Sequence, residues 1–165
     1  MRFNTAATSI TQLVLSNDFL EVWKDDSSGQ HSAFARIAFR SGDVLCDFGA
    51  SAIVQHPSYL TVQLSADEHI YLQPAYLQYI NHSCEPNVFF DTTEFKLVAL
   101  RDINAGDELY YFYPSTEWDM AQPFRCLCNS GDCLGYINGA SYLSKEQVNR
   151  YRFSSYISRL LSTKQ

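Results

Sequence analysis

The sequence lacks any run of about 18 apolar residues among its 165 positions, so no helix that spans a membrane is expected. Its first residues lack the continuous apolar core of a signal peptide. We therefore expect an intracellular protein, located in the cytoplasm or, if the host is a eukaryote, in the nucleus. Neither composition nor pattern indicates an oligomeric state.

An excess of basic residues is also lacking, because 12 lysines and arginines stand against 18 aspartates and glutamates, for a net charge of −6. Proteins that bind nucleic acid directly usually carry a basic patch, so this class of function is not expected. An acidic surface instead suits a basic, lysine-containing protein or peptide partner, although acidity also serves plain solubility.

No internal repeat or low-complexity tract is present, and 46% hydrophobic residues can form the core of one domain over residues 1–165. Short runs rich in aromatic and β-branched residues, separated by turn signals, predict a mostly-β fold of small sheets. The expected strands are 19–23, 33–39, 44–48, 59–64, 70–72, 88–90, 95–100 and 109–112. Residues 75–80 suit one or two helical turns. Ser144, with Gln147 three positions later, predicts the start of a C-terminal helix at about 144–161.

Three of the five cysteines are closely spaced, as Cys126, Cys128 and Cys133. In an intracellular chain, this spacing indicates metal binding rather than disulfide bonds. Structural zinc takes four ligands, so three thiolates need one more. The alternatives for the fourth ligand are Cys84 and His82, which lie close together earlier in the chain.

The most specific motif is Asn-His-Ser-Cys-Glu-Pro-Asn at residues 81–87, and a second motif, Gly-Asp-Glu-Leu at 106–109, leads to Tyr113. These motifs resemble the signature of the SET-domain protein lysine methyltransferases, and the cysteine triplet resembles their zinc-binding post-SET segment. The resemblance covers roughly residues 29–135. The nine-cysteine cluster that precedes some SET domains is missing, so a compact unit of SET plus post-SET is expected.

The resemblance implies the SET fold, in which several small β-sheets surround a pseudoknot made by threading the C-terminal segment under a loop. Because threaded chains are rare, this topology does not follow from periodicity. The expected parts are a SET core at about 17–115, a post-SET segment at about 122–137 and the C-terminal helix. The resemblance also implies one structural Zn²⁺, held by Cys84, Cys126, Cys128 and Cys133, which clips the C-terminal segment over the cofactor site.

S-adenosylmethionine is the cofactor that the resemblance implies. The expected binding residues are Gln30, His31, Ser32, Ala33, Asn81, His82, Tyr113 and Leu127. Gln30 and Ser32 stand where the family has a Gly-x-Gly, and a Cβ restricts positive φ values. Gln78 stands where many relatives carry an arginine. An alternative interpretation makes Asn81 a structural corner that bonds its own backbone.

Tyr113 lies at the spacing of the family's catalytic tyrosine, so the resemblance implies that it aligns the lysine amine with the methyl group. Tyr111 resembles the tyrosine or phenylalanine that limits the number of methyl groups added, and its hydroxyl predicts mainly monomethyl-lysine. The alternative for both is core packing, because residues 110–113 form an aromatic run.

The expected function is the transfer of a methyl group to the ε-amine of a lysine in a protein, such as a histone. The departures at Gln30, Ser32 and Gln78 keep an alternative open, a SET domain without turnover that serves as a zinc-stabilised interaction module. A small-molecule methyltransferase of the nucleotide-binding α/β class is not expected, since strands and helices do not alternate along the chain.

Overall fold

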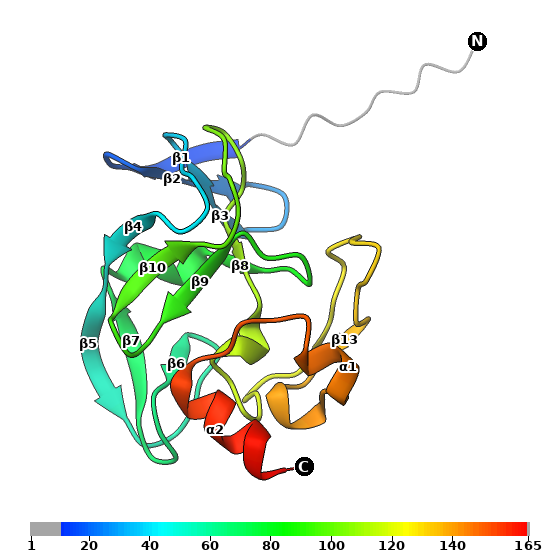
Figure 1. Ribbon diagram of the computed structural model, residues 1–165. Coiled ribbons are helices and arrows are strands. Elements are labelled where there is room, and N and C mark those ends of the chain that lie inside the picture. The colour runs from blue at the N-terminus through cyan, green and yellow to red at the C-terminus, as the bar shows by residue number, and fades with distance from the viewer. Residues whose placement is uncertain (1–10, 165) are drawn as a thin grey trace.

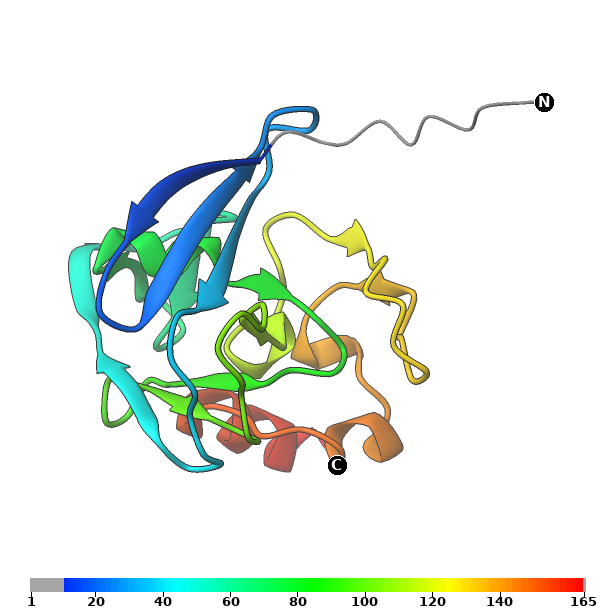
Figure 2. The ribbon, with the colours of Figure 1, turned by 90° about the horizontal axis from the view of Figure 1, so that it is seen from above.

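The computed structural model describes residues 11–164, and within them the chain forms five small β-sheets (Figures 1 and 2). The first is antiparallel and contains β1 (Thr11–Ser16), β2 (Leu20–Asp25) and β3 (His31–Ala35). The second has the order β4–β10–β9, from β4 (Val44–Asp47), β9 (Val88–Asp91) and β10 (Lys96–Ala99). The third has the order β5–β7–β6, from β5 (Gly49–Val54), β6 (Thr61–Gln63) and β7 (His69–Gln73).

Two further sheets are pairs of two-residue strands. One is the parallel pair of β8 (Asn81–His82) with β11 (Tyr110–Tyr111), and the other is the antiparallel pair of β12 (Phe124–Arg125) with β13 (Tyr136–Ile137). The prediction of a mostly-β fold of small sheets is therefore confirmed. Residues 81 and 82, at the start of the most specific motif, were not among the predicted strands but are paired in β8.

Each of the eight predicted strands has a counterpart, with shifted ends. The largest shift is in the segment expected at 33–39, where β3 ends at Ala35 and Phe39 makes only an isolated bridge to Ile103. Among the strands of three or more residues, β1 and β5 were not predicted. Both have mostly exposed side chains, so burial does not impose the alternation of polar and apolar residues on which strand prediction depends.

The helices are short. They are the 3₁₀ helices η1 (Ala75–Tyr79), η2 (Tyr113–Ser115) and η3 (Ala140–Tyr142) and the α-helices α1 (Lys145–Val148) and α2 (Ser155–Thr163). Among the described residues, no helix is long and apolar enough to cross a membrane.

The prediction of a single C-terminal helix at 144–161 is wrong, because α1 ends at Val148 and α2 starts at Ser155. The expected start is present, since Ser144 and Gln147 form a reciprocal capping box. The residues between the helices are instead drawn onto the body of the protein. The ring of Tyr151 stacks on Phe112 with centroids 3.7 Å apart, and the amide of Ser154 donates to Ser115 at 2.9 Å. These tertiary contacts override the helical pattern.

The main core lies beneath the first three sheets and contains fully buried side chains such as Leu77, Ile80, Phe90 and Leu97. The segment from 120 to 137, drawn in yellow and orange in Figure 1, has a much smaller apolar cluster. Its buried members are Cys126 and Ile137 from this segment and Cys84, which follows β8. So little apolar burial is weak support for a folded segment, and a bound metal is the usual supplement.

The parallel pair of β8 and β11 brings the two signature motifs side by side. The amide of Ser83 donates to Tyr111 at 3.2 Å, and that of Asn87 donates to Tyr110 at 3.0 Å. The side chain of Asn87 also donates to the carbonyl of Glu108 at 2.8 Å. These bonds fix residues 81 and 82 next to the aromatic run that follows Glu108.

Candidate functional site

Four cysteines from two distant parts of the sequence meet in one cluster. Their sulfur atoms all lie within 4.8 Å of one another, and they belong to Cys84, Cys126, Cys128 and Cys133. The sulfurs of Cys84 and Cys126 are 3.9 Å apart. Tetrahedral zinc with Zn–S bonds of about 2.3 Å places its sulfurs about 3.8 Å apart. The four thiols therefore lie close enough together to hold a structural zinc ion.

The surroundings of the cluster also suit a metal. Backbone amides of Leu134 and Gly135 donate to the sulfurs of Cys84 and Cys133, each at 3.4 Å, and such bonds stabilise thiolates. Burial raises the pKa of Cys84 above its ordinary value and raises that of Cys126 to about 11. Buried thiols of this kind release their protons when a cation binds.

His82 lies beside the cysteine cluster and does not belong to it. Its Nδ1 accepts a hydrogen bond from the amide of Tyr113 at 3.2 Å, and burial lowers its pKa to about 4. A neutral imidazole that accepts at Nδ1 carries its proton on Nε2, which lies 3.5 Å from the sulfur of Cys84. His82 thus connects the cysteine cluster to the backbone of Tyr113. Cys84 and His82 were the two alternatives for the fourth metal ligand, and the geometry favours Cys84.

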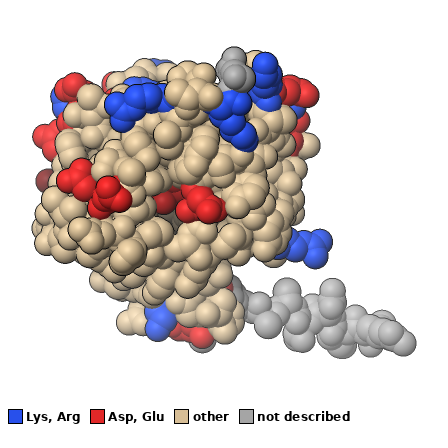
Figure 3. All heavy atoms as spheres, turned by 90° about the horizontal axis from the view of Figure 1, so that it is seen from below, with Lys and Arg blue, Asp and Glu red and all other residues tan. Residues whose placement is uncertain are grey.

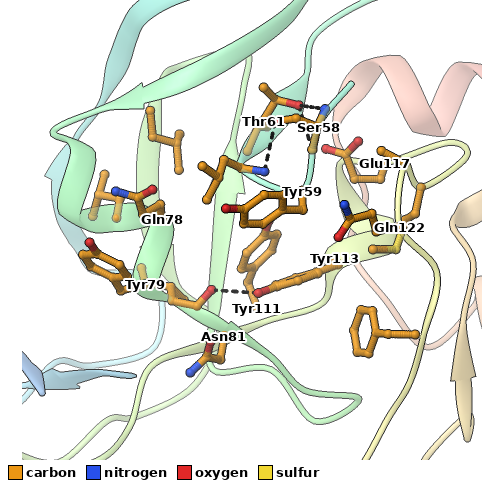
Figure 4. A pocket seen from close by; sticks show the side chains of 18 of the residues that line it. Ser58, Tyr59, Thr61, Gln78, Tyr79, Asn81, Tyr111, Tyr113, Glu117 and Gln122 are labelled. Carbon is orange, nitrogen blue, oxygen red and sulfur yellow. Dashed lines mark hydrogen bonds between the residues drawn. The ribbon is translucent and has the colours of Figure 1, made fainter. Parts of the chain in front are cut away.

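Next to this cluster lies a cavity of about 680 Å³ (Figure 4). One wall comes from the start of β3, from Gln78 and Tyr79 at the end of η1, and from Asn81 of β8. The opposite wall comes from the segment that contains Glu117 and Gln122. Residues 58–62, from β6 and the turn before it, cover a third side. The cavity is thus enclosed by segments from four separate parts of the chain.

Asn81 is held rigidly at the edge of this cavity. Its side-chain amide donates to the carbonyl of His31 at 2.9 Å and to the hydroxyl of Ser32 at 3.1 Å. Glu108 accepts a third bond from the same amide at 3.3 Å and a bond from the hydroxyl of Tyr110 at 2.5 Å. The side chain therefore ties β8 to β3 and does not bond its own backbone, as the structural-corner interpretation required.

The loss of both family glycines does not strain the backbone. Gln30 and Ser32 are not among the residues with positive φ, whereas the neighbouring Gly29 has a φ of +72°. His31 starts β3, and its ring stacks on Tyr79 with centroids 4.5 Å apart. The side chains at these two positions are therefore compatible with an extended chain that presents its backbone to the cavity.

Tyr111 and Tyr113 lie together inside the cavity, with ring centroids 4.6 Å apart. The hydroxyl of Tyr113 points across the cavity toward the carbonyl of Ile80, at 3.4 Å. Burial raises the pKa of Tyr113 to about 12 and raises that of Tyr111 well above its ordinary value. Both side chains are therefore neutral hydroxyls near pH 7, able to donate and accept hydrogen bonds but not to serve as phenolate bases.

The predicted cofactor residues divide into two groups. Those that line the cavity are Gln30, His31, Asn81 and Tyr113. Those that do not are Ser32, Ala33, His82 and Leu127. Ser32 and His82 support the lining residues through the bonds described above. Ala33 is fully buried in the core, and Leu127 is 73% exposed beside the cysteine cluster.

Several lining residues were not identified from the sequence. They include Glu117 and Gln122, together with residues 58–62 and Met120. The only sequence signal for Glu117 is weak: an acidic residue between aromatic residues, four positions after Tyr113. Residues 58–62 were predicted as part of a strand, with no indication of which side they would cover.

Comparison with known proteins gives matches over most of the chain. The family model described as SET domain matches residues 6–114. Methyltransferase flvH of Aspergillus flavus is 34% identical over 163 residues, which cover 90% of this chain and 91% of that protein. The H3 lysine-4 specific histone-lysine N-methyltransferase of Emericella nidulans is 40% identical over 68 residues, 37% of this chain and only 6% of that protein.

Among solved structures, a humanized mutant of the Chaetomium thermophilum Polycomb Repressive Complex 2 aligns with a TM-score of 0.44 and 19% identity. That alignment covers 61% of this chain and 15% of the other chain.

Proposed function

The chain belongs to the SET domain family of methyltransferases, and we propose that it transfers a methyl group from S-adenosylmethionine to the ε-amine of a lysine in a basic protein. The proposal rests chiefly on one observation: Asn81 and Tyr113 line the same cavity, and a four-cysteine cluster lies beside it. The two motifs that resemble the SET signature and the segment that resembles the post-SET zinc segment thus meet at a single site.

In the proposed reaction, bound S-adenosylmethionine supplies a methyl group on a positively charged sulfur. The protein's part is chiefly alignment, because an in-line transfer needs three atoms in a row and no covalent enzyme intermediate. Asn81 and the backbone at residues 30–31 are placed to hold the cofactor at one end of the cavity. Tyr113 is placed to orient the amine and the methyl group through its neutral hydroxyl.

The aromatic walls of the cavity also affect the charge of the amine. A free lysine titrates near pH 10.4, so only about one molecule in a thousand is neutral near pH 7.4. Burial beside Tyr111 and Tyr113, close to a cationic sulfur, lowers the pKa of an incoming amine by desolvation and by repulsion of like charges. The cavity therefore favours the neutral amine that can attack.

A basic protein is the proposed substrate class. The chain carries a net charge of −6, and Figure 3 shows acidic side chains in the middle of one face, with basic side chains mainly along its edges. Such a surface attracts lysine- and arginine-rich segments. The Emericella nidulans relative is named for a histone lysine, so histone tails are the first substrates to test.

Binding of S-adenosylmethionine separates this proposal from a SET domain that serves only as an interaction module. We expect calorimetric titration of the zinc-loaded protein to give a saturable isotherm with about one site per chain. Methylation of an array of lysine-containing peptides, read by mass spectrometry, then identifies the substrate. A folded, zinc-loaded protein that shows neither binding nor transfer would support the interaction module.

Tyr111→Phe is expected to change the product and not the first transfer. The side chain is only 8% exposed, and after one transfer its hydroxyl occupies space that a methylated amine needs. An ordered water held there costs up to about 2 kcal/mol to immobilise and resists displacement. We expect the unmutated protein to stop mainly at monomethyl-lysine and the variant to continue to di- or trimethyl-lysine in time-resolved mass spectrometry.

The control for this experiment is Tyr142→Phe, which removes a hydroxyl from an exposed side chain on η3, outside the cavity. It should leave the product distribution unchanged. Efficient formation of trimethyl-lysine by the unmutated protein would show that Tyr111 does not limit methylation.

A further inference from the structure

Glu117 is a buried acid whose carboxyl group faces the cavity. The residue is only 6% exposed, and it lies across the cavity from Gln78 and Tyr79 (Figure 4). One carboxyl oxygen accepts the amide of Gln63 in β6 at 3.0 Å. The backbone carbonyl accepts the amide of Ala140 at 2.8 Å. The carboxyl group is therefore held against β6, and the backbone of the residue is held against the start of η3.

No positive group of the described chain accompanies this acid. None of the four ion pairs in residues 11–164 includes Glu117, and no lysine or arginine of this part of the chain lines the cavity. A buried carboxylate without a cation is costly, and burial raises the pKa of Glu117 to about 8 despite the bond from Gln63. An acid in this state, placed in a cavity, is a common feature of functional sites.

The walls around Glu117 define the ligand that fits. Tyr59, Leu60 and Val62 lie on one side and the rings of Tyr111 and Tyr113 on another. Aromatic and aliphatic walls suit a chain of methylene groups, and one carboxylate in such a cavity suits a single positive charge at its end. An alkylammonium group combines both properties.

We infer that Glu117 binds the substrate amine, pairing with its ammonium form and accepting its proton before methyl transfer. The inference rests on the proposed function, since it assigns the group that receives the lysine in the same cavity. Glu117 thereby selects a primary amine over a neutral side chain of similar length.

The proton and the electrons balance in this scheme. The ammonium gives one proton to the Glu117 carboxylate, which leaves a neutral amine and a neutral carboxylic acid. The amine lone pair then forms the nitrogen–carbon bond while the carbon–sulfur bond breaks and its electron pair stays on sulfur. The product is a methylammonium group, and Glu117 returns its proton to water after the product leaves.

Other titratable groups nearby do not compete for this proton near neutral pH. Tyr111 and Tyr113 stay protonated because burial raises the pKa of each. His69, which pairs with Gln63 across β6 and β7, has its pKa lowered by burial and is neutral. His31 is at the far end of the cavity, beside Tyr79.

The test uses Glu117→Gln, which keeps the length of the side chain and an oxygen to accept the amide of Gln63. Glu94→Gln, at an exposed glutamate outside the cavity, is the matched control. For the best peptide of the array, we expect the KM of the Glu117 variant to rise by about 30-fold or more, as when one partner of a buried charge pair is removed. Binding of S-adenosylmethionine should not change in either variant, which also shows that both are folded.

The pH profile gives a readout that a merely structural role would not move. Only ionised Glu117 pairs with an ammonium, so kcat/KM of the unmutated protein should rise with pH through about 8. Glu117→Gln should lose this rise and keep only the later rise that reflects the amine itself. An unchanged KM and an unchanged pH profile in the variant would overturn the inference and leave the proposed function standing.

A second measurement does not depend on activity. Carbon-13 labelled glutamate lets the carboxyl signal of Glu117 be assigned as the one missing in Glu117→Gln. n-Butylammonium chloride should lower the pKa read from that signal, whereas n-butanol should not. No response to n-butylammonium would overturn amine binding. A response in a protein that methylates no peptide would support amine binding and count against the proposed function.

Discussion

Replacing Tyr113 by phenylalanine is expected to lower methyl transfer by about 100-fold or more while S-adenosylmethionine still binds. The hydroxyl faces the cavity and is held near the carbonyl of Ile80 at 3.4 Å. Its effect belongs to the transition state, where the amine and the methyl carbon must be in line, so the loss should fall on kcat. Single-turnover kinetics with a peptide substrate and calorimetry with the cofactor measure the two quantities separately.

The ring of Tyr113 should remain in place in this variant. It packs against His82 at a centroid distance of 5.2 Å and against Phe124 at 5.9 Å, and phenylalanine preserves both contacts. Tyr76→Phe is the control, because Tyr76 is a partly buried tyrosine of the main core that does not line the cavity. Near-normal turnover by Tyr113→Phe would move the alignment role to another member of the aromatic run, with Tyr111 as the first alternative.

The features that could be predicted from the sequence depend on residues that are close together in the chain. The close set of Cys126, Cys128 and Cys133 predicts that their thiols meet in one cluster, because a single turn can bring them together, and their sulfurs and that of Cys84 do lie within 4.8 Å of one another. The capping box of Ser144 identifies the start of α1 because both of its bonds lie within four residues. The mostly-β character likewise follows from short aromatic and β-branched runs.

The features that were missed depend on contacts between distant residues. The pairing of β8 with β11 joins segments about 30 positions apart, and the local sequence at Asn81 and His82 does not indicate a strand. The break between α1 and α2 comes from Tyr151 stacking on Phe112. Glu117 was overlooked for the same reason, since its place in the cavity depends on Gln63, 54 positions earlier.

Replacing Cys128 by serine is expected to lower the zinc content from about one ion per chain to well below half. Three thiolates cannot complete a tetrahedral site, and a serine hydroxyl is a poor ligand for zinc. We expect cofactor affinity to fall by about tenfold or more as well. Phe124, two residues before Cys126, lines the cavity. His82, two residues before Cys84, does not line it but accepts a bond from the amide of Tyr113, which does, so the cluster supports two parts of the cavity wall.

Elemental analysis of freshly purified protein and calorimetry with S-adenosylmethionine test this prediction. Cys46→Ala is the control, because Cys46 is a partly buried thiol on β4 and lies outside the cluster, so zinc should stay near one ion per chain. A chelator should reproduce the effect of Cys128→Ser in the unmutated protein, and added zinc should reverse it. A folded, unmutated protein with no zinc would contradict the metal site. Full cofactor affinity after zinc removal would show that the cluster stabilises the segment without closing the cavity.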